Sequence, residues 1–495
     1  MLFKLALGVV AFVVLALAVF VVVATTRKRS RSIAFFHPFC DAGGGGERVL
    51  WQGIVGLLTS AQYDTYSIVI YAKRGANRSQ VLAKVKDQFG IELSQDQTRR
   101  IALVPLKLWP LLEAERYKRL TLIGQSLGSM LVAAEALLAN APPFVFVDTI
   151  GFAFTFPVAK LLGAGSVVAY VHYPTISSDM IGVVKSGVES FNNRGLVAKS
   201  SLGRNLKLGY YKAFAVLYTF VGSYADVIMV REHDCCLDTF HHPCSSQANS
   251  SWTIGHLNEI WRQPNRTRVL YPPCDTKSLI GYGVHDRERV IVSVAQFRPE
   301  KAHNLQLDSL HSLLSAHHSL KTGPQRVKLL FIGGARHAND RALADAVLVR
   351  AKELGIEENV EVLVNASYPD LRAWLGRASV GLHAMRDEHF GIGIVEYMAS
   401  GLIPVANNSG GPKMDIINTK DEASRTGYLA TTAQEYADAI FTALNLSDAD
   451  QASMRKRARV SVETRFGNDA FQNGFMAAFD QVLSMSTNPE SKKKQ

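Results

Sequence analysis

The chain has 495 residues, of which 54 are Lys or Arg and 43 are Asp or Glu, so its formal net charge is +11 and its pI is near 9.3. This length exceeds what one hydrophobic core usually supports, and it predicts two domains of roughly 200 residues each. The positive charge favours an anionic partner such as a nucleotide or a phospholipid surface. Because the sequence has neither zinc-finger spacing nor a basic stripe interleaved with aromatic residues, nucleic acid is the least favoured partner.

The first segment is strongly apolar. Residues 3–25 carry one charge, at Lys4, followed by about 20 apolar residues, enough to cross a bilayer. A signal peptide is the alternative, but its apolar region would span only ~7 to 15 residues and end in a cleavage site. Here the run leads straight into RKRSR. We therefore predict a membrane anchor with a basic flank over residues 1–31, and the positive-inside rule places the rest of the chain in the cytosol.

The cysteines and the C-terminus bear on the compartment. Five cysteines without framework spacing suit a reducing environment. The basic tail, residues 486–495, ends in SKKKQ, in which Lys492 and Lys493 are either solvated or a dilysine retrieval signal for the endoplasmic reticulum. Both interpretations remain open.

After the anchor, short apolar runs alternate with stretches of helical pattern. This alternation predicts parallel, doubly wound α/β sheets. We predict one Rossmann-like domain over residues 32–265, a second over 266–465, and a final helix over 466–485. The runs are SIAFFHPF, YSIVIYA, RIALVPL, FVFVDTI and SVVAYVHYP in the first domain, and RVLYPP, RVIVSVAQF, VKLLFIGG, VEVLVNA, SVGLHAM and LIPVANN in the second.

Two segments of the first domain, residues 106–138 and 206–230, are apolar and also basic or aromatic. Neither offers the uninterrupted run that crossing a membrane requires. They are interpreted as core helices, with a surface in the lipid headgroup zone as the alternative.

Two short motifs suggest other chemistry. The sequence GQSLG, residues 124–128, matches a hydrolase nucleophile elbow with Ser126 as nucleophile, but it lies inside one long helical pattern. The sequence DAD, residues 448–450, resembles a metal-binding carboxylate pair, but a polar turn before a basic helix favours a helix start. We predict neither a hydrolase nor a metal site.

Glu388 and Glu396 lie eight residues apart around Gly391 and Gly393. If 391–400 is a helix ending at Gly401, eight residues of helix rise about 12 Å, more than the ~5 to 9.5 Å between the carboxyls of a glycosidase. Each glutamate is then expected to contact a different part of a long ligand. The glycines bare the backbone at the helix start, where N–H groups attract phosphate. An extended nucleotide sugar satisfies these contacts.

Arg298 and Lys301 lie in the turn after the strand-like run RVIVSV. That turn is at the carboxyl edge of the sheet, where α/β proteins bind ligands. Two cations at that edge, without a convincing metal motif, predict a metal-free clamp on a leaving diphosphate.

These residues carry a resemblance. The pattern E-x7-E in EHFGIGIVE, with AQFRPEK, FIGG and NNSGGP, resembles the retaining family 4 glycosyltransferases of the GT-B fold. The strings PFCDAGGGGERVLW, VHYPTISSDM and GLHAMRDEHFGIGIVEYMASGLIPVANNSGGPKMDI further resemble the GDP-mannose-dependent α-1,2-mannosyltransferases of the dolichol-linked oligosaccharide pathway. The resemblance covers residues 38 to 416.

The resemblance implies two Rossmann-like domains facing a cleft, with the final helix crossing back to the first domain. It implies that Glu388 contacts the donor sugar near the reacting carbon, Glu396 holds the ribose, and His172 faces the donor sugar as an active-site histidine. The implied catalytic set is Glu388, His172, Lys301 and Arg298; the donor-binding set is Arg298, Lys301, Gly333, Glu388, Phe390, Gly391, Ile392, Gly393 and Glu396; and the cleft loop is Gly43, Gly44, Gly45, Gly46, Glu47 and Arg48.

The function implied is a retaining, metal-independent transfer of mannose from GDP-mannose, in α-1,2 linkage, onto dolichyl-diphosphate-linked Man3/Man4-GlcNAc2. It would take place on the cytosolic face of the endoplasmic reticulum, in a single-pass membrane protein that could join other mannosyltransferases of the pathway. The alternatives are a GT-B enzyme with another nucleotide-sugar donor, such as UDP-glucose, and a catalytically silent membrane-anchored scaffold.

Overall fold

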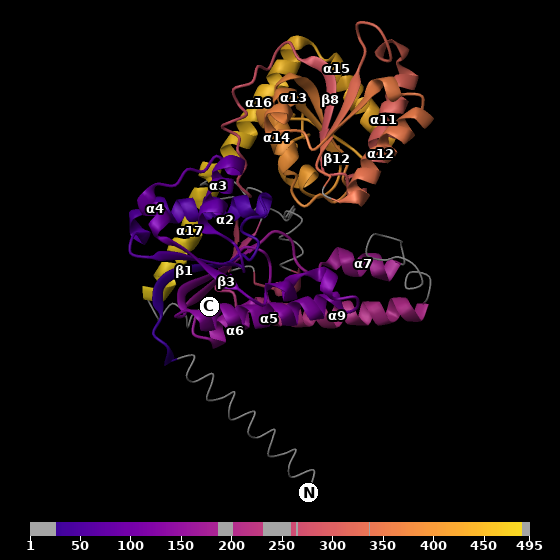
Figure 1. Ribbon diagram of the computed structural model, residues 1–495. Coiled ribbons are helices and arrows are strands. Elements are labelled where there is room, and N and C mark those ends of the chain that lie inside the picture. The colour runs from indigo at the N-terminus through magenta and orange to yellow at the C-terminus, as the bar shows by residue number, and fades with distance from the viewer. Residues whose placement is uncertain (1–25, 187–200, 231–258, 264–265, 336, 488–495) are drawn as a thin grey trace, which may run out of the picture. The chain divides into compact units, whose positions relative to one another are not determined.

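The computed structural model describes residues 26–186, 201–230, 259–263, 266–335 and 337–487 (Figure 1). They form two compact units. The first unit holds the described residues up to 230, those from 259 to 270, and those from Gln472 onward; the second is Tyr271–Phe471. The predicted anchor segment and the Lys-rich end of the tail lie outside the described residues.

The first unit is built on a parallel sheet with strand order β3-β2-β1-β4-β5-β6-β7. The chain runs from the central β1 outward through β2 and β3, then returns to β4 on the other side of β1. This reversal creates a switch point at the carboxyl ends of β1 and β4, where loops diverge. The strands are β1 Ser30–Phe36, β2 Ser67–Lys73, β3 Ile101–Leu106, β4 Pro143–Asp148, β5 Ser166–Val171, β6 Val227–Val230 and β7 Thr267–Val269.

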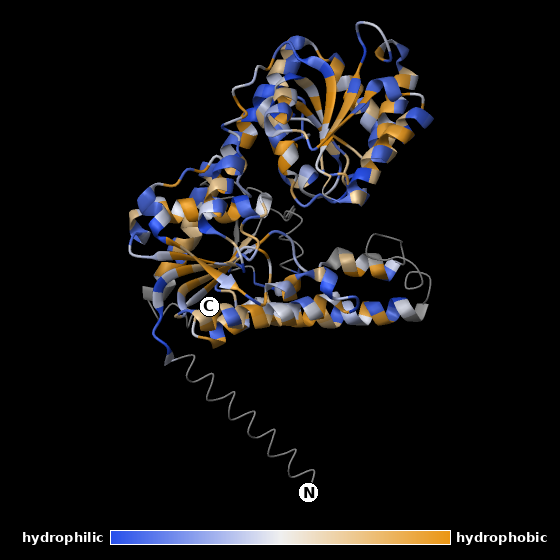
Figure 2. Ribbon diagram, viewed as in Figure 1, coloured by the Kyte–Doolittle hydropathy of each residue, from blue (hydrophilic) through white to orange (hydrophobic). Residues whose placement is uncertain are grey.

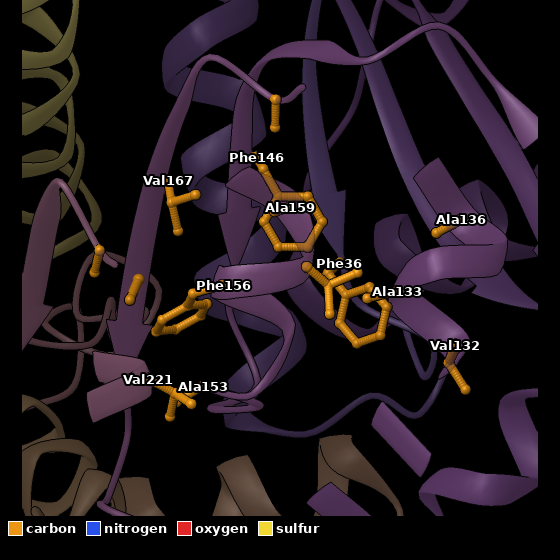
Figure 3. Packing of buried hydrophobic residues seen from close by; sticks show 14 of the residues in the cluster. Phe36, Val132, Ala133, Ala136, Phe146, Ala153, Phe156, Ala159, Val167 and Val221 are labelled. Atoms are coloured by element: carbon orange, nitrogen blue, oxygen red, sulfur yellow. The ribbon is translucent and has the colours of Figure 1, made fainter. Parts of the chain in front are cut away.

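Helices cover both faces of this sheet. One face carries α5, α6 and α9, whose buried residues Val132, Phe156 and Phe214 join one apolar cluster with strand residues such as Phe36 and Phe146 (Figure 3). The helices and 3-10 turns are α2 Gly45–Thr59, η1 Ala61–Tyr63, α3 Arg78–Phe89, α4 Gln95–Arg99, η2 Trp109–Leu112, η3 Ala114–Arg116, α5 Thr121–Ala139, α6 Thr155–Leu161, α7 Ser178–Ser186 and α9 Ser201–Gly222.

The last helix, α17 Asn468–Thr487, packs on the first unit through contacts with α2 and η1. The side chain of Gln472 donates to Gln52 at 2.7 Å, and Tyr63 donates to Asp480 at 3.0 Å. The Phe475 ring packs closely against Gly53, because a Cβ at position 53 would lie only 2.8 Å from the ring. Gln472 and Asp480, near the end of the chain, are thereby hydrogen-bonded to elements near its beginning.

The second unit repeats the architecture with strand order β10-β9-β8-β11-β12-β13, again all parallel. The switch point lies between β8 and β11. The strands are β8 Glu288–Val294, β9 Lys328–Gly333, β10 Val360–Val364, β11 Ala378–His383, β12 Ile403–Asn407 and β13 Tyr428–Ala430. Its helices and short turns are η5 Pro299–Lys301, α11 His303–Ala316, η6 His318–Leu320, α12 Ala338–Glu353, η7 Glu357–Asn359, α13 Tyr368–Arg377, α14 Ile392–Ser400, η8 Pro412–Ile416, α15 Ala433–Asn445 and α16 Asp448–Phe466.

Some strand predictions were wrong. The run RVLYPP was expected to open the second sheet, but β7 pairs with β6 and completes the first sheet. The strands β6 and β13 were not predicted, because β6 follows directly on the helical pattern of α9 and β13 has only three residues. Strands of three or four residues are too short to show a period.

The interpretation of the two misleading motifs is confirmed. Ser126 lies within the helix α5 rather than on a strand-to-helix elbow, and Gly124 lets the Tyr117 ring approach, since a Cβ there would lie 2.3 Å from it. Asp448 and Asp450 form the first turn of α16, where the Ser447 side chain caps the helix. Carboxylates in a first turn are stabilised by the helix dipole.

Within the described residues, α5 is the one helix long and apolar enough to cross a membrane by length and composition. Core helices pass the same test, and α5 contributes Val132, Ala133 and Ala136 to the core of the first unit. Its composition is therefore weak support for a membrane span.

Gly381 of β11 positions the carboxyl end of the neighbouring strand β8. The Tyr397 ring of α14 lies directly over Gly381, and its hydroxyl accepts the N–H of Val294 at 2.7 Å. A Cβ at position 381 would lie 2.3 Å from the Tyr397 ring, closer than real contacts allow. The last N–H of β8 therefore depends on a glycine in the adjacent strand.

We expect Gly381→Ala to lower the free energy of unfolding by about 1–3 kcal/mol, because the buried Tyr397 ring must shift. Gly281→Ala is the matched control, since a Cβ at Gly281 meets no atom within 4 Å. Urea unfolding of the full-length chain in detergent measures both. Equal midpoints for the two variants would contradict the proposed packing role.

Candidate active site

The candidate residues of the second unit meet at the carboxyl edge of its sheet. Lys301 closes the turn after β8, His383 is the last residue of β11, and Glu388 follows in the next loop. The Glu388 carboxylate accepts from Lys301 Nζ at 2.8 Å and lies 3.3 Å from His383 Nε2. Lys301 Nζ also lies 3.0 Å from the Met385 sulfur. The fold thus brings a cation, an imidazole and a carboxylate from two strands to one point.

The charge state of Glu388 follows from these contacts. Burial alone would raise its pKa, but the hydrogen bond from His383 and the positive charge of Lys301 outweigh burial and hold the pKa far below its ordinary value. Glu388 is therefore ionised at physiological pH. Since Lys301 is ion-paired to Glu388, its charge is partly neutralised before any ligand arrives.

Glycines hold the Glu388 loop in place. The N–H of Gly411 donates to the Glu388 carbonyl at 2.8 Å, and a Cβ on Gly410 would lie 2.4 Å from that same oxygen. Gly391 caps α14 with a φ of 108°, a conformation that other residues adopt only with strain. The glycine pair of NNSGGP therefore allows its backbone to pack directly against the loop that carries Glu388.

The predicted helix after Glu388 is confirmed, with Gly401 as its left-handed cap and Val395, Met398 and Ala399 fully buried. However, α14 begins at Ile392, so Glu388 lies outside the helix. The rise of about 12 Å per eight helical residues therefore does not apply to the Glu388–Glu396 separation. Only the five residues from Ile392 to Glu396 belong to the helix.

The other donor-side candidates fall into two groups. Arg298 immediately precedes the η5 turn, and its side chain is half-buried. A Cβ on Gly393 would meet only the Val294 carbonyl, at 3.9 Å, so Gly393 lies at the end of β8. Gly333 is needed for strand packing, since a Cβ there would lie 2.0 Å from the Ala295 oxygen. The Phe390 ring is fully buried between Tyr271 and Phe466, so its side chain belongs to the core.

The candidates of the first unit gather around Thr149, the residue after β4. His172 donates from Nε2 to the Thr149 carbonyl at 3.0 Å, and the buried His37 contacts the Thr149 hydroxyl at 2.7 Å through Nδ1. His37 Nε2 lies 3.3 Å from the Glu47 carboxylate. Because a carbonyl can only accept, His172 carries its proton on Nε2.

The glycine loop is fixed by this network. Glu47 accepts the N–H of Gly44 and is itself buried, so it holds the loop rather than lining a cleft. Gly43 has a φ of 82° and lies against Gln88, and a Cβ on Gly46 would lie 3.5 Å from His172 Nε2. The Arg48 guanidinium stacks 5.2 Å above the Phe89 ring. Of the loop residues, Gly46 is therefore the one that lies beside the candidate histidine.

Among the residues that the structure describes, no group of three or more His, Cys, Asp or Glu side chains is arranged to hold a metal ion.

Comparison with known proteins assigns the family. The model described as ALG11 mannosyltransferase N-terminus matches residues 30–233, and the one described as Glycosyl transferases group 1 matches residues 280–461. A Dictyostelium discoideum protein named GDP-Man:Man(3)GlcNAc(2)-PP-Dol alpha-1,2-mannosyltransferase is 42% identical over 94% of this chain and 88% of its own length. The chain belongs to this mannosyltransferase family. The Homo sapiens family member is 38% identical over 92% of this chain and 88% of its own length.

Solved structures identify the fold. A trehalose-phosphate synthase from Burkholderia vietnamiensis has a TM-score of 0.59 at 13% identity and covers 93% of this chain and 100% of its own. Anabaena Alr3699/HepE, in complex with UDP and glucose, has a TM-score of 0.55 at 16% identity and covers 90% and 99%. At these identities the likeness concerns the fold alone, and it confirms the GT-B prediction for this family member.

Sequence reasoning missed three residues of these networks: His383, His37 and Thr149. The Nδ1 atom of His383 is buried and has no hydrogen-bond partner among the residues that the structure describes. For two of them the sequence did contain a signal, because His37 and His383 both lie at the carboxyl end of a predicted strand. Thr149 gave no signal, since its hydroxyl and carbonyl act only through the fold.

Asp148, at the end of β4, is fully buried beside this network. Its carboxylate accepts the N–H groups of Ile150 and Gly151 at 3.0 to 3.2 Å. Burial raises the pKa of Asp148 to about 7, although these backbone hydrogen bonds lower it in part.

We expect Asp148→Asn to flatten the pH dependence of stability. Between about pH 4 and pH 7 the folded protein holds a proton at Asp148 that the unfolded chain has lost, so stability falls as pH rises, by up to about 4 kcal/mol. The variant lacks this decline. Urea unfolding at pH 5 and pH 8 measures it, with exposed Asp96→Asn as control. Parallel pH curves for wild type and Asp148→Asn would contradict the assignment.

Proposed function

We propose that this protein transfers mannose from GDP-mannose, in α-1,2 linkage, onto Man3- and Man4-GlcNAc2 carried on dolichyl diphosphate. The observation that carries the proposal is identity of 38 to 42% with enzymes of that name over more than nine-tenths of the chain. That span includes both groups of candidate residues. We infer the transferred sugar and the lipid acceptor from the names of these relatives.

The donor-side residues support a division of roles. The diphosphate of GDP-mannose leaves with negative charge, and Arg298 and Lys301 at the end of β8 supply cations for it. The first turn of α14, opened by Gly391 and Gly393, adds N–H groups that attract phosphate. Glu388 faces the sugar carbon on which positive charge develops, while Glu396 holds the ribose. Phe390, Ile392 and Gly333 shape this site through the backbone and through packing.

The first-unit residues support a role at the sugar. His172 is oriented by its hydrogen bond to the Thr149 carbonyl, and the adjacent glycine loop leaves room for close approach. We assign His172 to the donor sugar and the loop to the acceptor side. The transfer retains configuration, as expected for family 4, and requires no metal because Arg298 and Lys301 provide the positive charge.

We place the protein in the endoplasmic reticulum membrane as a single-pass protein with both units in the cytosol. Support comes from the apolar segment at residues 3–25 and from its basic flank. Interaction with other mannosyltransferases of the same pathway is consistent with this placement.

The assay that tests the function incubates the purified chain with radiolabelled GDP-mannose and a lipid-linked Man3-GlcNAc2 acceptor. We expect the label to be transferred to the acceptor. The transferred label should resist α-mannosidases that do not cleave α-1,2 bonds, and the transfer should persist in excess EDTA. UDP-glucose serves as the control donor. Transfer from UDP-glucose and not from GDP-mannose would show that the donor is different. No transfer from either nucleotide sugar would indicate a scaffold. Activity that is lost in EDTA and restored by Mg²⁺ would reveal a metal requirement.

The two glutamates should separate in kinetics. Glu388→Gln removes a charge that acts mainly in the transition state, so we expect kcat to fall by about 10² or more with little change in KM for GDP-mannose. Glu396→Gln weakens the grip on a ribose that does not react, so KM should rise with a smaller loss of kcat. Thermal unfolding controls for misfolding. Identical profiles for both variants, or abolished kcat in Glu396→Gln at saturating donor, would refute this division.

A further inference from the structure

A cavity of about 390 Å³ lies at the amino edge of the second unit's sheet. The loop before β8, the start of β11, the end of α15 and the first turns of α16 form its wall. The strands of this unit are apolar along most of their length (Figure 2), so polar side chains collect at the strand ends. The seven residues of β8 span about 20 Å, which separates this cavity from the candidate site at the carboxyl edge.

Three arginines line the cavity: Arg287, Arg289 and Arg455. Arg455 is only 2% exposed, and a guanidinium buried to this extent is normally paired with a carboxylate. In the described chain, however, every hydrogen-bond partner of these three guanidiniums is a carbonyl or amide oxygen. Asp286 and Asp448 also line the cavity, yet neither forms an ion pair with them.

These oxygens satisfy Arg287 but not the other two guanidiniums. All three nitrogens of Arg287 donate to backbone carbonyls, among them those at the ends of α13 and α14, so this residue is structural. Arg455 donates from Nη1 to the Val284 carbonyl at 2.8 Å, whereas its Nε and Nη2 are buried without an acceptor among the described residues. Arg289 donates from Nη1 and Nη2 to oxygens at the end of α15, at 3.2 and 3.4 Å, and its buried Nε has no acceptor there either.

The arginines also lack negative charge around them. Burial lowers the pKa of Arg287 to about 9, and the positive charges of Arg455 and Arg459 add to this effect. Burial lowers the pKa of Arg455 to about 10, although Asp448 acts in the opposite direction. An anion in the cavity would offset the unfavourable burial and the repulsion, because opposite charges at close range stabilise each other.

The lining suits a phosphate group attached to a polar molecule. A guanidinium presents two parallel N–H groups that match two phosphate oxygens, and two guanidiniums with unused donors lie at this cavity. Elsewhere in the lining, Ser379, Asn445 and Gln451 supply hydroxyl and amide groups, and Asp286 and Asp448 supply acceptors for hydroxyl groups. The cavity therefore fits a small phosphate monoester whose organic part carries hydroxyl groups.

We propose that this cavity is a second anion site, which binds the dianion of phosphate, free or as the monoester of a sugar. It is separate from the diphosphate site assigned to Arg298 and Lys301, and it does not rest on the proposed function. The strand β8 connects the two sites, since Arg289 lies at its start and Lys301 in the turn after its end.

Thermal unfolding of the full-length chain in detergent tests the site. The probes are inorganic phosphate, mannose 6-phosphate and unphosphorylated mannose, with chloride keeping the ionic strength constant. At saturation we expect each phosphate probe to raise the unfolding midpoint by about 2 °C or more, because a ligand that binds only the folded state stabilises it. Mannose should leave the midpoint unchanged. A lower half-saturating concentration for mannose 6-phosphate would identify a sugar ester as the ligand, and equal values would identify free phosphate.

Two variants test the arginines. Arg289→Gln changes a partly exposed side chain and should weaken binding of both phosphate probes by about tenfold or more, because the charge and the fork of donors are lost. Arg455→Lys keeps the charge without the fork and should also weaken binding. Arg341→Gln, at an exposed arginine of α12, is the matched control. Each shift is measured from the variant's own phosphate-free midpoint, so a change in intrinsic stability does not imitate a loss of binding.

Lys301→Ala distinguishes this cavity from the candidate active site. The shift caused by phosphate should persist in Lys301→Ala, since Lys301 lies beyond the opposite end of β8. A shift that is lost in Lys301→Ala but kept in Arg289→Gln would place the phosphate at the candidate active site and overturn the inference. So would an unshifted midpoint of the unsubstituted chain, or equal shifts in Arg289→Gln and Arg341→Gln. Because the measurement is unfolding rather than mannose transfer, failure of the proposed function leaves this test intact.

Discussion

The site of the second unit depends on the partly buried ion pair between Lys301 and Glu388. Two charges are partly withdrawn from water there, which is favourable only when further hydrogen bonds complete their coordination. His383 supplies one to the carboxylate, and the backbone N–H of His389 supplies another at 3.1 Å. Lys301 comes from the turn after β8, whereas Glu388 comes from the loop after β11. Only a parallel sheet with β8 and β11 as neighbours brings these loops together.

The glycines near this pair follow from the same requirement. A loop that must hold Glu388 against a lysine of another strand has little freedom, so its backbone is packed directly against the next loop. Gly410 and Gly411 permit that contact, and Gly391 turns the chain sharply into α14. The buried Phe390 ring anchors the same loop in the core. The position of the Glu388 carboxylate is thus fixed by backbone packing.

The first unit uses an analogous arrangement around one threonine. Thr149, at the end of β4, contacts His37 from β1 through its hydroxyl and His172 from β5 through its carbonyl. Three neighbouring strands therefore converge on one residue at the switch point.

The sequence by itself determined the two doubly wound sheets, because apolar runs and helical patterns alternate locally, and it determined the helix that ends at Gly401. Its motifs also singled out Glu388, Lys301 and His172. Tertiary structure decided what local patterns cannot encode: that β7 pairs with β6, that Glu47 and Phe390 are buried, and that His383 meets Glu388. Periodicity in a sequence reports which side of an element is apolar, whereas partners across strands are set by sheet order and loop packing.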